Sequence, residues 1–256
     1  MILRRFMQHV NQQNWFAVGL DLIVVITGIF LGMQVSDWNE ERLNRSLETE
    51  YLQRLQVDIQ ANIVALQETE NIYQVLIGDI LKVIRIVEGE EPLDTAGEEF
   101  VTQAIPLNAA WRHIALELGT IRELIGSGEM NLIQDRELRQ RLIGIVSKFE
   151  AMNEQLTFYK DWYLNNEEDL LAGLYARMNL SADTFSSTGV SSISSLETTK
   201  QSMSSTINRQ EFLSKRKTRA LSLMLAARNT MLGTFRTNLA YLKETAGMLA
   251  EAEKLR

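Results

Sequence analysis

The chain has 256 residues, of which 45% are hydrophobic and 23% are charged, and this composition excludes disorder as its main state. It contains no cysteine and only two histidines, which excludes disulfide scaffolds, thiolate metal sites and cysteine nucleophiles and nearly excludes imidazole chemistry. The 26 basic and 33 acidic residues give a net charge of −7, so we expect no nucleic-acid partner.

Residues 15–37 are predicted to form a transmembrane helix. The stretch from Trp15 to Val35 contains no basic side chain and one acid, and a helix of this length crosses a hydrocarbon core about 30 Å thick. Trp15 and Trp38 flank it as membrane-interface anchors. The alternatives are a buried soluble helix and a cleavable signal peptide. The apolar stretch is longer than that of a signal peptide and lacks a small-x-small cleavage site, which favours an uncleaved anchor.

The orientation of this helix is predicted less directly. Arg4 and Arg5 precede the span, but Arg42 and Arg45 closely follow it, so the positive-inside rule does not decide. The N-terminal amine and the long region that follows favour a short cytoplasmic N-terminus, residues 1–14, and translocation of residues 38–256.

Three residues of the span are predicted to mediate self-association. Asp21, Gly28 and Gly32 are separated by seven and four residues, so they lie within about 40° of one another on the helix surface. Gly28 and Gly32 allow close helix approach, and an acid that faces lipid is costly. The alternative is that Asp21 only snorkels or stays protonated. A ring of Asp21 carboxylates would also suit an ion or proton site.

An all-α fold is predicted for residues 38–256, in which the transmembrane helix continues into an elongated up-down-up-down antiparallel helical bundle with coiled-coil-like packing. The expected helices cover residues 38–88, 96–126, 136–178 and 209–255, the second of them broken at Pro106 and Gly119, and a Ser/Thr-rich loop covers 180–207. The apolar stripes that predict the three long helices are Leu52, Leu55, Ile59, Ile63, Leu66, Tyr73, Leu76, Ile80, Ile84 and Val87; Leu138, Leu142, Ile145, Phe149, Met152, Leu156, Tyr159 and Tyr163; and Ala220, Met224, Ala227, Met231, Phe235, Leu239, Leu242, Ala246 and Leu249.

Capping motifs predict where the helices start and stop. A Ser, Thr, Asp or Asn at the first position, with Glu three residues later, satisfies free backbone N–H groups at a helix start. A glycine with a left-handed conformation commonly ends a helix. The expected starts are Thr95 with Glu98, Thr120 with Glu123, Asp135, and Asn208 with Glu211, and the expected stop is Gly126-Ser-Gly128.

Lys215, Arg216, Lys217 and Arg219 form the densest basic cluster of the chain and are a candidate anion-binding patch. The alternative is that neighbouring acids at the end of the bundle neutralise them. His113 and Glu117 have the spacing of one helix face, which is a weak metal signal. The sequence contains no phosphate-binding glycine loop, zinc-hydrolase helix or nucleophile elbow, so we expect no enzyme activity, no cofactor and no metal site.

Two stretches, Gly19–Arg42 and Thr120–Arg139, resemble a domain-of-unknown-function family of single-span bacterial membrane proteins. In that family an acid-bearing span leads into an Asn/Asp-Trp-Asn-Glu junction, here Asp37-Trp-Asn-Glu40. This chain has Asp21 where the family has Glu, and Ser36-Asp37 where it has two asparagines. The resemblance implies a bacterial membrane protein and implies no activity.

The sequence therefore predicts a single-pass protein of the bacterial inner membrane whose periplasmic helical domain is a scaffold or partner-binding module. Its expected partners are the lipid bilayer, further copies of itself and an unidentified envelope protein. One alternative is a ligand-sensing helical domain that acts with a separate output partner. A further alternative is a small homo-oligomeric ion or proton channel with Asp21 in the pore.

Overall fold

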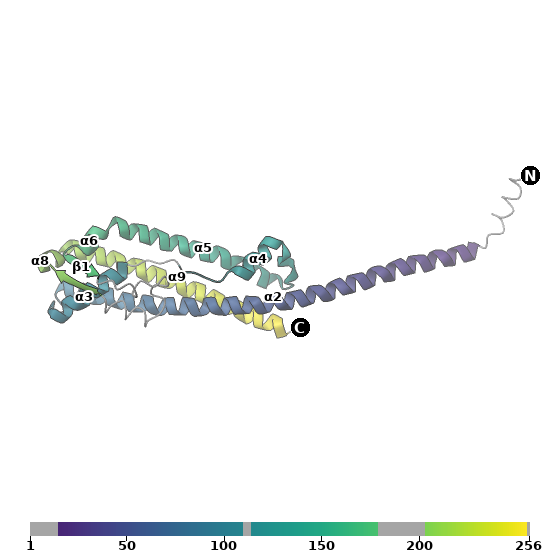
Figure 1. Cartoon of the computed structure of the whole chain (residues 1–256), viewed down its shortest axis with the longest axis horizontal. Coiled ribbons are helices and arrows are strands. Elements are labelled where there is room, and N and C mark those ends of the chain that lie inside the picture. Colours follow the sequence, from purple (N-terminus) through teal and green to yellow (C-terminus); the bar gives the residue numbers. More distant parts are fainter. Residues whose placement is uncertain (1–14, 110–113, 179–202, 255–256) are drawn as a thin grey trace, which may run out of the picture. The chain divides into compact units, whose positions relative to one another are not determined.

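The computed structural model describes residues 15–109, 114–178 and 203–254 (Figure 1). The chain divides into two units, Met1–Tyr51 and Leu52–Arg256, which are described separately. The expected cytoplasmic segment, residues 1–14, lies outside the described residues.

The described part of the first unit is a single stretch of helix, the beginning of α2 (Trp15–Glu88). No proline occurs between these bounds, so no residue there lacks the backbone N–H that the helix requires. The residues of the predicted span and those of the first predicted bundle helix therefore belong to one helix, as expected.

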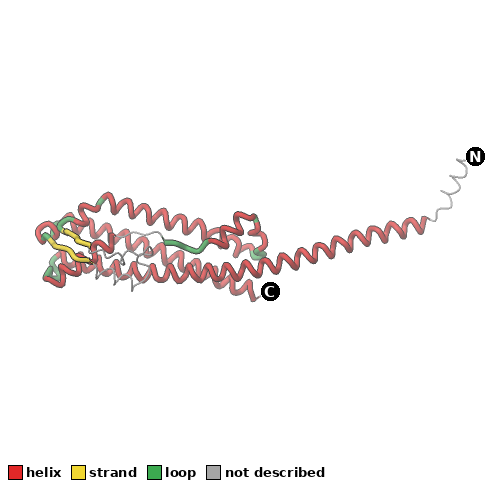
Figure 2. The backbone as a smooth tube through the Cα atoms, viewed as in Figure 1, coloured by secondary structure: helices red, strands yellow, loops and turns green. Residues whose placement is uncertain are grey.

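The second unit is built from the rest of α2 and the elements that follow it, and the prediction of an all-α fold is confirmed. Figure 2 shows helices throughout this unit and two short strands at one end of it. In chain order the elements after α2 are α3 (Thr95–Ala109), α4 (Gly119–Ser127), the 3₁₀ helix η1 (Glu129–Leu132), α5 (Arg136–Asn165), α6 (Glu167–Leu171), β1 (Leu174–Met178), β2 (Met203–Ile207), α8 (Arg209–Phe212) and α9 (Lys215–Lys254).

Side-chain contacts show that successive passes run in opposite directions, as predicted. Residues later in the α3–α4 region contact residues earlier in α2, so the two run antiparallel. The hydrogen-bonded pairs are Asn108 with Leu76, Glu117 with Asn62 and Glu123 with Arg54. The same reversal relates α5 to α9, in which Thr234 donates to Gln155 and Arg141 donates to Thr245. The second unit is thus an up-down-up-down bundle.

The core consists of the predicted apolar stripes. Every stripe residue named above is buried except Ile84, Val87, Tyr159 and Ala246, which are half-buried. Between α2 and α9, the Tyr73 and Phe235 rings meet edge to face with their centroids 4.7 Å apart. Removal of this apolar surface from water is the main stabilising term of such a bundle.

The third predicted helix ends earlier than expected. The structure has α5 to Asn165, α6 to Leu171 and then strand β1, whereas the sequence predicted helix to residue 178. Strand β1 pairs antiparallel with β2, with Leu174 opposite Ile207 and Met178 opposite Met203. Residues 203–207 are therefore a strand and not the end of the predicted loop, whose residues 180–202 lie outside the described residues.

Several capping predictions are also corrected. Asp94 and not Thr95 caps α3, because its Oδ1 accepts from the N–H of Gly97 at 2.9 Å. Pro106 lies inside α3 and does not break it. The predicted pair Thr120 and Glu123 does not cap α4: its first residue is Gly119, its N-cap residue Leu118 makes no side-chain cap, and Glu123 instead pairs with Arg54.

Two capping predictions are confirmed. Asp135 caps α5 by accepting from the N–H groups of Glu137 and Leu138, at 2.8 and 3.1 Å. Gly128, with φ of 76°, ends α4 in the left-handed conformation that glycine adopts without strain. Asn208 caps as expected, but it caps the short α8, and the long last helix α9 begins only at Lys215.

Candidate functional site

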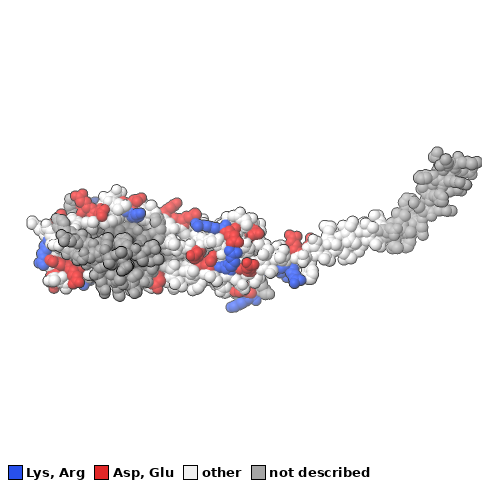
Figure 3. Space-filling model, in the orientation of Figure 1, with Lys and Arg blue, Asp and Glu red and all other residues white. Residues whose placement is uncertain are grey.

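The most unusual surface of the first unit is the apolar part of α2. The large apolar side chains from Leu22 to Val35 are each between 56% and 64% exposed, and the helix has a mean hydropathy of 1.4 over its most apolar stretch. No charged side chain lies on this stretch in Figure 3. A soluble protein rarely leaves an apolar surface of this length uncovered. The chain therefore has a helix long and apolar enough to cross a membrane.

The predicted association stripe lies in this stretch. A methyl group built on Gly28 or Gly32 would meet no atom within 4 Å, so the surface beside both glycines is open. The side chains of Asp21 and Trp15 lie outside the described residues. Trp38, the second predicted interface anchor, is 65% exposed. The structure thus leaves room for a neighbouring helix beside the two glycines.

The predicted anion-binding patch loses one of its four members. Lys217 is fully buried, and its Nζ donates to the carbonyl oxygen of Leu170 at 2.6 Å. Its ammonium lies 5.1 Å from the centre of the Phe212 ring, a cation–π contact. Arg219 is exposed, and the side chains of Lys215 and Arg216 lie outside the described residues. Lys217 therefore joins α6 to α9 inside the bundle and is not part of a surface patch.

Burial lowers the pKa of Lys217 to about 8, and the carboxylates of Glu211 and Asp169 partly oppose this shift. The cause is the loss of water around the ammonium, which disfavours its charged form. The sequence predicted only a cluster of cations, because it does not show which side of α9 each residue occupies.

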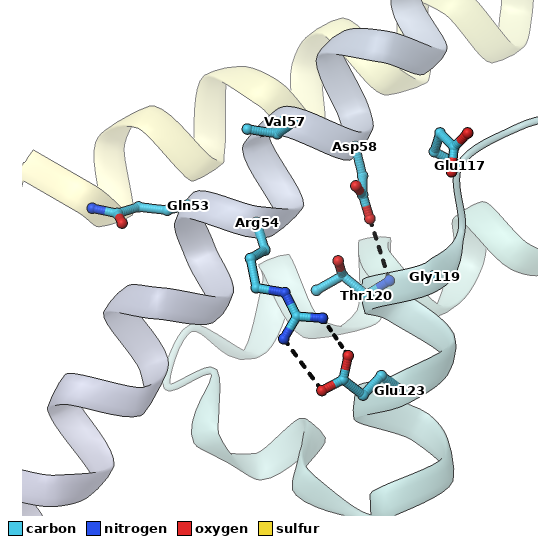
Figure 4. Close-up of a pocket in the computed structure, with 8 residues that line it drawn as sticks. All are labelled: Gln53, Arg54, Val57, Asp58, Glu117, Gly119, Thr120 and Glu123. Carbon is cyan, nitrogen blue, oxygen red and sulfur yellow. Dashed lines mark hydrogen bonds and ion pairs between the residues drawn. The ribbon is translucent and has the colours of Figure 1, made fainter.

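An open groove of about 520 Å³ lies in the second unit between α2 and α4 (Figure 4). Arg54 of α2 makes a two-pronged ion pair with Glu123 of α4. One helical turn further along α2, Asp58 accepts from the backbone N–H of Thr120 at 3.2 Å. Asp58 thereby satisfies one of the free N–H groups in the first turn of α4 and places negative charge there, which the helix dipole favours.

The polar groups of this groove bind one another. Arg54 and Glu123 neutralise each other, and Asp58 is committed to Thr120. Because the Arg54 and Glu123 side chains are 41% and 45% exposed, we expect their pair to contribute at most about 1 kcal/mol to stability. The groove therefore positions α4 on α2 and is not a convergent binding pocket.

A buried asparagine fixes the segment between α3 and α4. The amide of Asn62 donates to the carbonyl oxygen of Glu117 at 2.7 Å and accepts from the N–H of the same residue at 2.7 Å. Residues 114–118 are not helical, so the predicted helical pairing of His113 with Glu117 is wrong, and His113 itself lies outside the described residues. Asn62 thus satisfies both backbone groups of an irregular segment, as a strand partner would.

A second buried polar cluster lies in the bundle core. Arg228 is 1% exposed, its guanidinium donates to the carbonyl oxygen of Asn108 at 2.6 Å, and it lies 4.7 Å from the centre of the Tyr73 ring. Burial lowers the pKa of Arg228 and raises the pKa of Tyr73. No sequence pattern indicated this cluster, because a lone arginine among apolar residues gives no signal of its partners.

The described ranges contain no group of three or more His, Asp and Glu side chains arranged to hold a metal ion. Comparison of the chain with protein-family models, with curated proteins and with solved structures finds no match.

Proposed function

We propose that this chain is a single-pass protein of the bacterial inner membrane, with its N-terminus in the cytoplasm and its helical bundle in the periplasm as a scaffold or partner-binding module. The observation that supports it is the uninterrupted exposed apolar surface of α2 between Leu22 and Val35. A bilayer covers such a surface at no polar cost, because every backbone group of the helix is already hydrogen-bonded within it.

Self-association of the span is the second part of the proposal. Gly28 and Gly32 are open on the surface of α2, and their spacing allows two helix backbones to approach closely. Asp21, on the same stripe, would face the neighbouring helix instead of lipid. Assembly in the membrane would multiply the number of bundles presented to a partner, which raises avidity without new contacts.

Membrane insertion is tested with the full chain expressed in bacteria. The chain is expected to stay in the membrane fraction after alkaline carbonate extraction. Because it contains no natural cysteine, Phe158→Cys, at an exposed position of α5, provides a unique thiol. A membrane-impermeant maleimide added to intact spheroplasts should label it. Extraction by carbonate would contradict insertion, and labelling only after lysis would reverse the orientation.

Self-association is tested with Gly28→Leu and Gly32→Leu. The bulkier side chains separate the helices, so the oligomer in mild detergent is expected to shift towards the 29.2 kDa monomer by light scattering coupled to chromatography. Ile29→Leu and Met33→Leu, each one position further along α2, are the matched controls. Asp21→Asn separates charge from packing, because asparagine keeps the size and hydrogen bonding of the side chain. An unchanged oligomer in both glycine variants would overturn this part of the proposal.

A further inference from the structure

The part of α2 in the second unit has one face without charge. Between Gln53 and Gly78, every exposed residue of this helix is uncharged, although 23% of the whole chain is charged. These residues are Gln53, Gln56, Val57, Gln60, Ala61, Val64, Gln67, Asn71, Gln74, Val75 and Gly78. On α5, by contrast, the exposed residues include Lys148, Glu150, Glu154 and Lys160. We call this set the uncharged face of α2.

The uncharged face repeats every seven residues. Val57, Val64, Asn71 and Gly78 occupy one position of the heptad, and Gln53, Gln60, Gln67 and Gln74 occupy another. Each residue of the first series is followed three positions later by a residue of the second, as Val57 is by Gln60. This is the a-to-d spacing of a coiled-coil seam. Two series with this spacing form a continuous line along one side of the helix.

The charged residues of the same part of α2 face their own bundle. Arg54 pairs with Glu123, Asp58 accepts from the N–H of Thr120, and Glu70 accepts from Arg236 at 2.7 Å. Figure 4 shows Gln53 and Val57 pointing away from α4, towards which Arg54 and Asp58 extend. The fourth charged residue, Glu68, is half-buried at the flank of the uncharged face.

We propose that the uncharged face is a seam on which the α2 helix of a second copy of this chain packs, parallel and in register. In a twofold interface each position meets its own counterpart, so any charge on the seam would repel itself. A face without charge meets that requirement. The exposed Val57 and Val64 supply apolar contacts at the a positions, and a paired Asn71 fixes the register.

The inferred seam rests on the proposed function for its direction, because two copies inserted in a membrane with one orientation have parallel α2 helices. From Gln53 to Gly78 the seam measures about 38 Å along the helix. Its large share of glutamine makes it a weak interface in isolation, and attachment of both copies to one membrane raises their effective concentration.

The test uses single cysteines in the full chain, which contains none of its own. Val57→Cys and Val64→Cys place thiols at positions that are 70% and 51% exposed, and Phe158→Cys and Ile143→Cys on α5 are controls at 64% and 46% exposure. Oxidation in membranes is expected to shift most of the Val57→Cys and Val64→Cys protein to twice the chain mass, since facing a positions bring Cα atoms within disulfide reach. Equal cross-linking at the α5 controls, or none on α2, would overturn the seam.

A charge-swap experiment tests whether the facing surface is a second copy. Val64→Lys in the Val57→Cys background should abolish the cross-linked band, because two lysines then face each other, and Val64→Glu should do the same. Coexpression of the two variants, one with a longer tag, should restore only the mixed dimer. Phe158→Lys is the control and should leave the band unchanged. A band that persists in the Val64→Lys chain alone would contradict the proposal.

The experiments can contradict the proposed seam and the proposed association through the span independently of each other. If Gly28→Leu and Gly32→Leu weaken the detergent oligomer while Val57→Cys and Val64→Cys cross-link no better than the α5 controls, the proposed function stands and the seam is wrong. If Val57→Cys and Val64→Cys cross-link selectively while the glycine variants change nothing, the seam stands and association through the span is wrong.

Discussion

The buried side chain of Asn62 on α2 binds both the N–H and the carbonyl oxygen of Glu117, each at 2.7 Å. An asparagine amide has the same donor and acceptor pair as a peptide group, so it can replace a missing strand neighbour. Without it the N–H and the carbonyl oxygen of Glu117, which lies in a non-helical segment, would lose their partner on α2.

Asn62→Ala is therefore expected to lower the free energy of unfolding by about 1–3 kcal/mol, because two hydrogen bonds to the backbone of Glu117 are lost and each contributes about 0.5–1.5 kcal/mol. Urea unfolding of the purified chain in detergent, followed by circular dichroism, measures the change. Asn229→Ala, which removes an exposed asparagine of α9, is the control and should change stability by less than about 0.5 kcal/mol. Equal effects of the two substitutions would contradict the assigned role of Asn62.

The buried Lys217 predicts how stability depends on pH. The unfolded chain holds this proton up to the ordinary lysine pKa of 10.5, whereas burial lowers the folded pKa to about 8. Between these values the unfolded state binds more protons, so stability rises with pH, by at most about 1.4 kcal/mol per unit. Below pH 8 both states are protonated and the full cost of burying the charge is present.

Lys217→Met should remove this rise, and the exposed Lys243→Met should retain it. Urea midpoints at pH 7.5 and 9.5 make the comparison, because the tyrosine contribution starts only above about pH 10. There it has the opposite sign, since burial raises the pKa of Tyr163 to about 12 and the folded state keeps its proton longer. An identical rise in Lys217→Met would show that another group is responsible.

Among the glycines whose surroundings the structure describes, Gly173 is the one whose replacement should cost most. Its φ is 77°, and an added Cβ would lie 2.6 Å from the backbone nitrogen and 2.9 Å from the Cα of Phe212. Gly173→Ala is expected to destabilise the bundle by at least about 2 kcal/mol, because a left-handed alanine is strained and the backbone at the contact cannot move aside cheaply.

The matched control is Gly126→Ala in α4, where an added methyl group meets nothing within 4 Å. Alanine is a better helix former there and should stabilise by up to about 1 kcal/mol. Thermal unfolding in detergent should shift in opposite directions for the two variants. A neutral Gly173→Ala would mean that α8 is not held against this turn.

The cap of α5 gives a fourth prediction. Asp135→Ala removes the acceptor of two N–H groups and is expected to cost about 0.5–2 kcal/mol, whereas Asp135→Asn, which keeps an acceptor, should cost less. Hydrogen exchange of the first turn of α5 reports the same change locally. Equal exchange in all three proteins would contradict the capping role.

The sequence predicted the long helices well because each has an apolar stripe at helical spacing, from Leu52 on α2 to Leu249 on α9. The prediction failed where the local structure depends on contacts with another part of the chain. Strand β2, Met203–Ile207, lies among serines and threonines and becomes a strand by pairing with β1. Pro106 was expected to break α3, yet the helix continues to Ala109.

The polar contacts show the same limit. Asp135 is a cap that the local sequence defines, and it was predicted. The roles of Asn62, Lys217 and Arg228 depend on segments 47 to 120 residues away, so no local pattern indicates them. The sequence places Lys217 in a candidate anion-binding patch with Lys215, Arg216 and Arg219, and the structure buries it.

The contact between Glu70 and Arg236 joins residues 166 positions apart, and Tyr73 meets Phe235 across the same two helices. The first helix of the bundle thus makes part of its core contacts with the last. During synthesis these contacts of α2 cannot form until α9 has emerged, so the core is incomplete before then. Such long-range pairing also makes folding slow relative to that of a helical hairpin. Nascent chains halted before α9 are therefore the species that a chaperone would have to protect from aggregation.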